Sequence, residues 1–289
     1  MTSLIFGANG QDGYYLKQLC EDKGINSIGI SRAGDMLIGD VSDYKQVENL
    51  VKDHKPAYIF NLAAKSTTRH DALFENHETI STGTINILES VYRHSRDSKV
   101  FITGSGLQFY NDGNPISEDN PFEASSPYGV ARIQSVYAAR YYRSLGVKTY
   151  VGYLFHHESP LRRQNHVSQK VVLAAKRIAE GSEEKLEMGD VSVAKEWTFA
   201  GDVANGIMTL VKQDTIFEAA IGCGKTYTIL NWIEVCFSQL GLDWRVHLKR
   251  TGNFKAEYKR LVSNPKLIQS LGWEAKVSFS ELANMMIGK

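Results

Sequence analysis

Leu4-Ile5-Phe6-Gly7-Ala8-Asn9-Gly10-Gln11-Asp12-Gly13 is the stretch of sequence that decides the fold. Its apolar beginning predicts a buried strand, and the residues behind it, Tyr14–Leu19, show the pattern of a helix. Glycine at every third position permits a tight turn from strand to helix and lets the backbone approach a pyrophosphate. The helix N-terminus then offers free N–H groups and the positive end of a dipole to the phosphates. We therefore predict a dinucleotide-binding site at this turn, which includes the side chains of Asn9, Gln11 and Asp12.

Apolar segments alternate with helical patterns through the first half of the chain. Six apolar segments are typical of strands: Leu4–Phe6, Ser27–Ser31, Met36–Asp40, Tyr58–Leu62, Val100–Thr103 and Thr149–Leu154. The spacing of apolar residues between them predicts helices at Tyr44–His54, Leu73–Arg93 and Tyr128–Leu145. Continuous apolar strands that alternate with helices indicate a parallel sheet covered on both faces. The expected fold is α/β, a Rossmann-type doubly wound parallel sheet with a smaller C-terminal α/β substrate domain.

Charge and cysteine content narrow the class of protein. The chain has 289 residues, with 33 basic and 32 acidic side chains and a formal net charge of +1. This balance gives no sign of a nucleic-acid or membrane partner. No apolar run is long enough to span a bilayer, and the N-terminus lacks the pattern of a signal peptide. Cys20, Cys223 and Cys236 are too few and too poorly spaced for a disulfide framework or a zinc site. We therefore expect a cytoplasmic enzyme without a bound metal.

The end of the second strand bears on the identity of the cofactor. In this fold an acidic residue there binds a ribose 2′-hydroxyl, whereas an arginine accommodates a 2′-phosphate. The second strand ends at Arg32, and no acid stands at its tip. Arginine is a permanent, planar cation that suits phosphate, so we predict NADP rather than NAD. Asp40 and Val41, at the end of the third strand, are placed to meet the adenine.

The second half of the chain changes character after residue 160. It contains the polar, basic stretch Arg162–His166 and then a helical pattern over Val171–Ala179. Two later segments, Tyr227–Leu240 and Asn264–Met286, look like a small appended domain. We expect an NADP-binding domain at 1–160, with a return segment at about 196–220. The substrate-binding domain is then expected at 161–195 and 221–289.

Ser126-Pro127-Tyr128-Gly129-Val130-Ala131-Arg132 is the segment expected to supply the chemistry. Tyr128 opens a helix, and Arg132 lies one turn further on the same face. A cation at this spacing favours the phenolate form of a tyrosine. Tyr128 can then act as general acid and base to a substrate hydroxyl during hydride transfer. Tyr-x-x-x-Arg alone is a weak motif, but its place one helix after the fifth strand of a dinucleotide fold strengthens it.

Five stretches along the whole chain match the motifs of a known family in the same order: Gly7–Leu16, Asn61–Ser66, Leu154–Arg163, Gly189–Val203 and Asn264–Leu282. Through them the chain resembles the extended short-chain dehydrogenase/reductase family and, within it, the GDP-mannose 4,6-dehydratase family. The resemblance implies oxidation of C4 of a GDP-hexose by hydride transfer to NADP⁺. A base then removes the C5 proton, water leaves from C6, and the hydride returns to C6, which regenerates the cofactor.

The resemblance also implies roles for single residues. Cofactor contacts are implied for the glycine loop, Tyr128 and Arg132, and for Leu62, Ala63, Ala64, Ser66, Leu154 and His157. Substrate contacts are implied for Glu158, Arg163, Val167, Lys170, Lys195 and Lys255.

The sequence departs from the family at its catalytic centre. The family has lysine where this chain has Arg132, and arginine cannot readily release a proton to a relay. When the motifs are anchored on Tyr110, the family's substrate-binding hydroxyl falls on Gly106, and its C5 base falls on Gln108. Neither residue supplies the missing group. Ser105 stands one residue too early and would face the other way in a strand, unless a one-residue bulge brings it back.

Two more departures concern binding and assembly. Lys195 and Lys255 stand where the family has arginines, and lysine lacks the bidentate fork that arginine offers to a diphosphate. The loop 31–35 replaces a longer segment that in the relatives helps a tetramer to form. We therefore expect a homodimer through the helices at about 73–93 and 128–145.

Three functions remain open. The first is an NADP-dependent dehydratase of the GDP-mannose 4,6-dehydratase type with an altered catalytic centre, in which Tyr128, Arg132, Gln108 and Ser105 are the candidate catalytic residues. The second is a reductase or epimerase of a 4-keto nucleotide sugar, which tolerates the loss of the C5 base better. The third is a catalytically impaired homologue that binds cofactor or sugar nucleotide.

Overall fold

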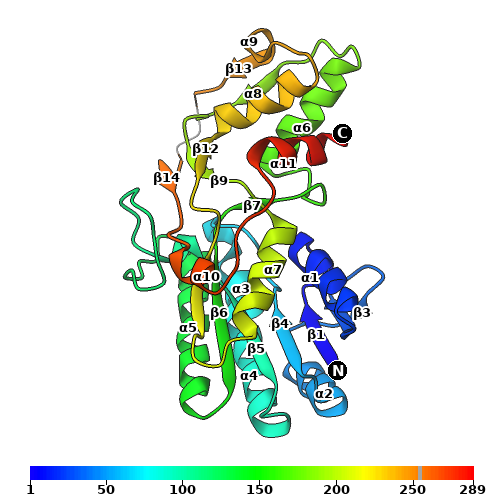
Figure 1. The fold of residues 1–289 in the computed structure, drawn as a ribbon, viewed down its shortest axis with the longest axis vertical. Coiled ribbons are helices and arrows are strands. Elements are labelled where there is room, and N and C mark those ends of the chain that lie inside the picture. Colours follow the sequence, from blue (N-terminus) through cyan, green and yellow to red (C-terminus); the bar gives the residue numbers. More distant parts are fainter. Residues whose placement is uncertain (253–255) are drawn as a thin grey trace.

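A seven-stranded sheet forms the centre of the larger lobe in the computed structural model, which describes residues 1–252 and 256–289 (Figure 1). The strands lie in the order β11-β6-β5-β4-β1-β2-β3, and each neighbouring pair is parallel. Their bounds are β1 Thr2–Phe6, β2 Asn26–Ser31, β3 Leu37–Ile38, β4 Tyr58–Asn61, β5 Lys99–Ser105, β6 Lys148–Leu154 and β11 Glu218–Ile221. The prediction of a doubly wound Rossmann-type sheet is confirmed.

Helices cover both faces of this sheet. Leu4 and Phe6 belong to one apolar core and Ile5 to the other, because side chains alternate along a strand. The first core is closed by α2 Tyr44–His54, α4 Gly83–His94 and α5 Pro127–Ser144. The second is closed by α1 Gln11–Asp22 and α7 Ala200–Val211. The central strands β1, β4 and β5 are therefore buried on both sides, which is why they contain continuous apolar runs in the sequence.

Two details of this lobe differ from the sequence prediction. The seventh strand, β11, was not predicted, because two of its four residues are alanines, which are weak strand formers. The helix predicted over 73–93 is three pieces: α3 Leu73–Asn76, a π-helical turn His77–Thr82, and α4. The three pieces follow one another without a break, and a π turn of six residues is too short for apolar periodicity to reveal it.

The smaller lobe has its own core, in which Trp197 and Trp232 stack with ring centroids 4.5 Å apart. Helices α6 Val167–Ala179, α8 Ile229–Gln239 and α11 Phe279–Ile287 surround it, with the short α9 Trp244–His247 at its far end. Its small sheets are β12-β9-β14 and β13-β8. Their strands are β8 Leu186–Met188, β9 Ala194–Glu196, β12 Thr226–Thr228, β13 Leu248–Arg250 and β14 Arg260–Leu261. This lobe is the smaller α/β unit that the fold prediction included.

The chain crosses between the lobes more often than the sequence suggests. Strand β7 (His157–Glu158) pairs with β10 (Thr198–Phe199) where the lobes meet. Helix α10 (Lys266–Ser270) returns to the larger lobe, because Ile268 and Trp273 pack in the same core as Ile5. The expectation that 221–289 belongs as a whole to the second unit is therefore corrected for this segment.

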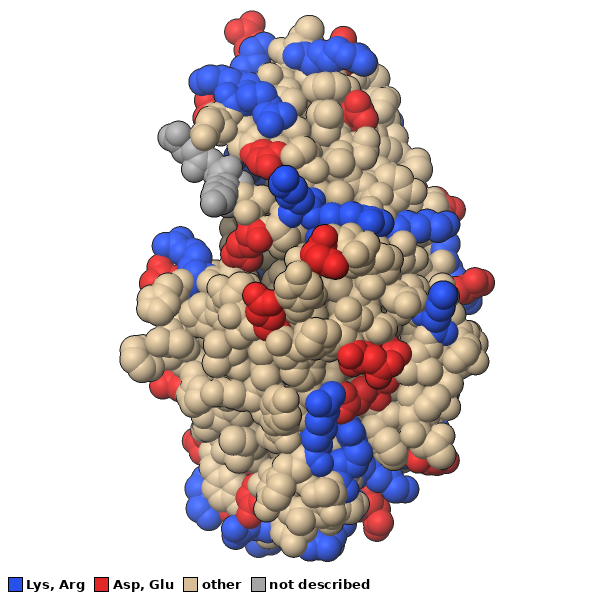
Figure 2. Space-filling model, turned by 90° about the vertical axis from the view of Figure 1, so that its left-hand side faces the viewer, with Lys and Arg blue, Asp and Glu red and all other residues tan. Residues whose placement is uncertain are grey.

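Charged side chains are mixed in sign over the surface. Figure 2 shows Lys and Arg interspersed with Asp and Glu on one face, which is notched between the two lobes. Among the described residues, no helix has both the length and the apolarity that crossing a bilayer requires.

Candidate active site

The glycine turn after β1 is shaped by its close neighbours. Gly7 has φ +85°, and a Cβ there would lie 2.8 Å from the backbone nitrogen of Ala63 after β4. A Cβ at Gly13 would lie 2.6 Å from the carbonyl oxygen of Gly7. Gly10 caps α1 without a side-chain hydrogen bond, so the first N–H groups of this helix face the turn without a side-chain cap. The turn thus has the form that a pyrophosphate needs.

Gln11 and Asp12 point toward the segment that follows β6. Gln11 accepts a hydrogen bond from Ser159 Oγ at 2.9 Å and donates to the carbonyl of His157 at 3.3 Å. Asp12 Oδ1 lies 2.8 Å from Nε2 of His157. Burial alone would raise the pKa of Asp12, but His157 outweighs it and lowers that pKa. In this structure the Gln-Asp pair therefore fixes the crossing between the lobes to the start of α1.

Tyr128 and Arg132 lie together on the first turns of α5, and both are buried. The Arg132 guanidinium carbon lies 5.0 Å from the centre of the Tyr128 ring, and its Nη1 donates to the carbonyl of Thr103 at 2.6 Å. Tyr128 packs with Leu107 and Ala64 in a small apolar cluster. The predicted acid/base and its cation are thus brought together at the ends of β4 and β5.

The turn after β5 has a specific hydrogen-bond arrangement. Gln108 is fully buried, and its Oε1 accepts from the backbone N–H of Ser105 at 2.8 Å. Ser105 Oγ in turn accepts from the backbone N–H of Leu107 at 3.2 Å. The β5–β6 register is regular through Ser105, which is paired with Leu154, so the bulge considered for Ser105 is absent. Ser105 caps the turn instead.

Charged side chains form a buried cluster at the junction of the lobes. Glu158 is completely buried and lies 2.7 Å from Arg162 and 2.8 Å from His156. Burial alone would raise the pKa of Glu158, but Arg162 and His156 hold it well below its usual range. Lys195 on β9 is also buried, with its Nζ 5.0 Å from the centre of the Trp197 ring. Burial lowers the pKa of Lys195 to about 8.

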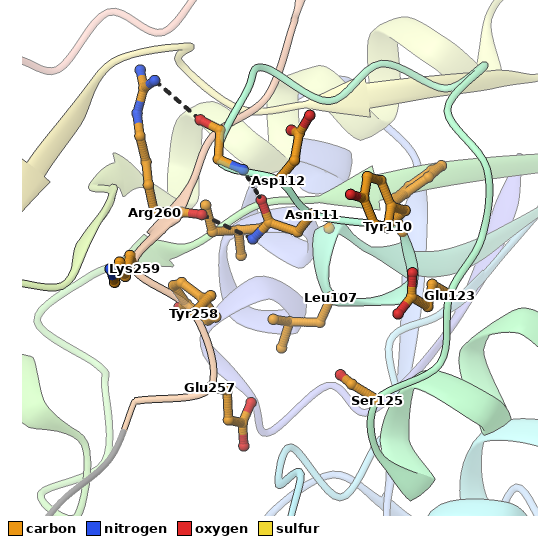
Figure 3. A pocket seen from close by; sticks show the side chains of 14 residues that line it. Leu107, Tyr110, Asn111, Asp112, Glu123, Ser125, Glu257, Tyr258, Lys259 and Arg260 are labelled. Carbon is orange, nitrogen blue, oxygen red and sulfur yellow. Dashed lines mark hydrogen bonds between the residues drawn. The ribbon is translucent and has the colours of Figure 1, made fainter.

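A cavity of about 350 Å³ lies between the turn after β5 and the smaller lobe (Figure 3). Its labelled side chains are Leu107, Tyr110, Asn111, Asp112, Glu123, Ser125, Glu257, Tyr258, Lys259 and Arg260. Asn111 donates to the carbonyl of Arg260 at 2.8 Å, and Arg260 donates to the carbonyl of Gly113 at 3.1 Å. The 110–113 loop is thereby tied to the strand that enters the smaller lobe.

Several other predicted contacts are more scattered. Asp40 accepts from the backbone and hydroxyl of Ser42 at 2.9 and 2.8 Å, while Val41 is buried in the core of the sheet lobe. Val167 packs against the core of the smaller lobe, and Lys170 donates to the carbonyl of Glu187 at 2.7 Å. Arg163 is exposed, and Lys255 lies outside the described residues.

Comparison with known proteins decides the family. A sequence model of the GDP-mannose 4,6 dehydratase family matches residues 4–286. The chain belongs to this family. It is therefore an extended short-chain dehydrogenase/reductase, as its five ordered stretches predicted.

Curated members of the GDP-mannose 4,6 dehydratase family align over nearly the whole chain. GDP-mannose 4,6 dehydratase 1 of Arabidopsis thaliana is 28% identical over 318 residues, which cover 99% of this chain and 88% of the relative. GDP-mannose 4,6-dehydratase of Yersinia enterocolitica is 28% identical over 346 residues, which cover 99% of this chain and 92% of the relative.

Solved structures share the fold of this family member at lower identity. dTDP-glucose 4,6-dehydratase from Bacillus anthracis, in complex with NAD, has a TM-score of 0.87 at 17% identity and covers 100% of this chain and 96% of its own. RMD from Pseudomonas aeruginosa, complexed with NADPH, has a TM-score of 0.85 at 16% identity and covers 99% of this chain and 96% of its own.

For this member of the GDP-mannose 4,6 dehydratase family, the structure adds residues that sequence reasoning missed. Asn111, Asp112, Glu123 and Glu257 line the cavity but belong to no motif. Tyr110, used above only to anchor the alignment, was the one available signal for the loop that carries two of them. No sequence pattern within residues 257–261 predicts that this segment lines the cavity, because its position depends on the fold of the smaller lobe.

Proposed function

We propose that this chain binds NADP and a GDP-hexose and acts on the sugar as a nucleotide-sugar 4,6-dehydratase with an altered catalytic centre. The glycine turn and the uncapped start of α1 would hold the pyrophosphate, as their geometry fits it. When bound, the cofactor would accept a hydride from C4 of the sugar and return it at C6. Arg32, at the end of β2, would bind the 2′-phosphate of the adenosine ribose.

The position of Tyr128 is the observation that supports this proposal. It packs against Ala64, which follows β4 beside the glycine turn, and against Leu107, which lines the cavity. A hydroxyl at this position can exchange a proton with O4 of the sugar while C4 faces a cofactor bound at the carboxyl ends of the strands. Arg132 keeps a permanent positive charge beside the Tyr128 ring, with its guanidinium carbon 5.0 Å from the ring centre.

The buried charges at the lobe junction are proposed to bind the diphosphate of the substrate. Lys195 would supply a single cation, without the two parallel N–H donors of an arginine. Glu158 would orient Arg162 and His156, both of which it contacts. Because Lys195 has a lowered pKa, an anionic diphosphate would favour its protonated form on binding.

A second candidate is reduction of a 4-keto nucleotide sugar, and Gln108 favours it. The amide is fully buried and its Oε1 holds the backbone of Ser105, so it cannot take the C5 proton as a carboxylate would. Reduction needs a hydride and one proton donor, and Tyr128 can supply the proton. This candidate therefore requires no group that the chain lacks.

We further propose a homodimer that pairs α4 and α5 of two copies. Ile85 on α4 and Val130, Tyr137 and Tyr141 on α5 are exposed large apolar side chains. The last three lie seven and four residues apart, which places them on one face of the helix.

The test is incubation of the full chain with GDP-mannose and NADP⁺, followed by mass spectrometry and NMR of the sugar nucleotide. We expect a 4-keto-6-deoxy product without net formation of NADPH. Tyr128→Phe should lower the rate by roughly 10²–10⁴-fold, because the proton donor is lost. Tyr137→Phe makes the same change on the exposed face of the same helix and should leave the rate within about twofold.

The other outcomes separate the alternatives. Oxidation of NADPH with a 4-keto nucleotide sugar, without dehydration of GDP-mannose, would establish the reductase and overturn the dehydratase. Binding of both ligands without any conversion would establish a catalytically impaired homologue.

A further inference from the structure

Glu75 on α3 lies between two cations from different parts of the larger lobe. Its Oε1 accepts a hydrogen bond from Arg32 Nη2 at 3.3 Å, and its Oε2 lies 3.3 Å from Lys65 Nζ. Arg32 and Glu75 are 43 residues apart in the chain. One carboxylate therefore uses both of its oxygens to join two loops that no local pattern connects.

The two loops are those that flank the glycine turn. Arg32 directly follows β2, and Lys65 follows β4. Both strands pair with β1, one on each side, and β1 ends at the turn. Ligands of open parallel sheets bind at these carboxyl ends, and the tip of the second strand is where the 2′ position of the adenosine ribose is bound. Glu75 thus lies beside the position that distinguishes NADP from NAD.

We propose that Glu75 is a cofactor-specificity residue that acts as an internal competitor of the 2′-phosphate. The inference rests on the proposed dinucleotide site. Its carboxylate occupies Arg32, the cation that the 2′-phosphate would use, so NADP must displace Glu75, whereas NAD leaves the pair in place. The 2′-phosphate carries about 1.5 to 2 negative charges, so it displaces the singly charged carboxylate of Glu75 from Arg32. The displaced carboxylate stays nearby and repels the phosphate, which weakens the binding of NADP. No acid stands at the end of β2 in the sequence, because the acid that meets Arg32 comes from α3.

The solvent exposure of the Arg32–Glu75 pair sets how strongly Glu75 weakens binding of a 2′-phosphate. The side chains of Arg32 and Glu75 retain 53% and 37% of their accessible area, so solvent screens the pair. Removing the charge of Glu75 should then strengthen binding of a 2′-phosphate by roughly two- to fivefold. The same change should leave a ligand with a free 2′-hydroxyl almost unaffected.

The experiment compares adenosine 2′,5′-bisphosphate with 5′-AMP, by calorimetry on the full chain, for wild type, Glu75→Gln and Asp71→Asn. Asp71 is a matched control, since it is an exposed acid of the same segment whose partner at 2.8 Å is Arg69. We expect Glu75→Gln to tighten the bisphosphate by roughly two- to fivefold with 5′-AMP unchanged, and Asp71→Asn to change neither. NADP⁺ and NAD⁺ should show the same shift in their ratio of affinities.

Four results would overturn the proposal. An unchanged ratio of bisphosphate to 5′-AMP affinity in Glu75→Gln removes Glu75 as a competitor. Weaker binding of 5′-AMP would mean that the carboxylate accepts from the ribose, and an equal shift in Asp71→Asn would mean general electrostatics. If neither dinucleotide binds any variant, the proposed cofactor site fails as well. That result differs from binding with an unchanged ratio, which removes the role of Glu75 alone.

Discussion

At the residue scale, the turn that contains Gly106 and Gln108 is fixed by the packing around it. A Cβ at Gly106 would lie 2.8 Å from Cε1 of the buried Phe155 ring, a distance that real Cβ contacts do not reach. Gln108 next to it holds the backbone of Ser105. The glycine and the glutamine are therefore parts of one packed turn, and the family's hydroxyl cannot be added without moving Phe155.

We expect Gly106→Ala to lower the free energy of unfolding by about 1–3 kcal/mol, because the added methyl overpacks against Phe155. Chemical denaturation measures this value. Phe155→Leu in the same chain should recover part of the loss that Gly106→Ala causes. Gly129→Ala is the control, since its nearest contact would be an ordinary 3.5 Å and alanine favours the helix. Equal stability of Gly106→Ala and wild type would show that the ring moves freely.

Single residues also show where sequence reasoning reached its limit. Tyr128 and Arg132 were predicted as a pair, and the structure brings them together, because spacing along one helix fixes their distance. Asp12 and Gln11 stay predicted cofactor contacts, and the structure adds that their side chains bond to His157 and Ser159, nearly 150 residues away in the chain. Local pattern contains no information about such partners.

At the element scale, the ion pair of Asp12 and His157 joins α1 to β7. Burial alone would lower the pKa of His157, but Asp12 raises it above 6.5. A raised histidine pKa stabilises the folded state fully below 6.5, and this contribution is lost as pH rises through the folded value. The lowered pKa of Asp12 stabilises the folded state above pH 3.8, and this contribution is lost as pH falls through the folded value.

Asp12→Asn should therefore cost the most stability, about 1–3 kcal/mol, between pH 3.8 and 6.5, and less as pH rises further. Thermal unfolding of wild type and variant between pH 5 and 9 measures the difference. Asp22→Asn, at the exposed end of the same helix, should show no such trend. A difference that grows above pH 7 would contradict the assignment of the pair.

At the scale of the whole molecule, the smaller lobe is held to the sheet by several crossings of the chain. β7 and β10 pair at the junction, and Thr68, after β4, donates to Glu257 of the smaller lobe. Helices α4 and α5 expose large apolar side chains on the face of the sheet lobe that they cover. The proposed dimer would pair these helices, whereas the cavity lies between the sheet lobe and the smaller lobe.

Light scattering should give a mass twice that of one chain for wild type. Tyr137→Glu together with Tyr141→Glu should weaken association by about tenfold or more, because two charges would be buried without partners. Val246→Glu, on α9 of the smaller lobe, changes an equally exposed apolar residue and should leave the dimer intact. A monomeric wild type, or a double variant that still dimerises at low concentration, would contradict this surface.

The sequence by itself determined six of the seven strands of the sheet, the glycine turn and the Tyr128–Arg132 pair, because each depends on periodicity or spacing within one strand or helix. Only the tertiary structure decided that Phe155 occupies the place of a side chain at 106, that Gln11 and Asp12 hold the lobe junction, and that Glu75 lies against Arg32. These features join residues that are distant in the chain. Their contacts arise when strand ends meet at one edge of the sheet, and no local pattern records which loops meet there.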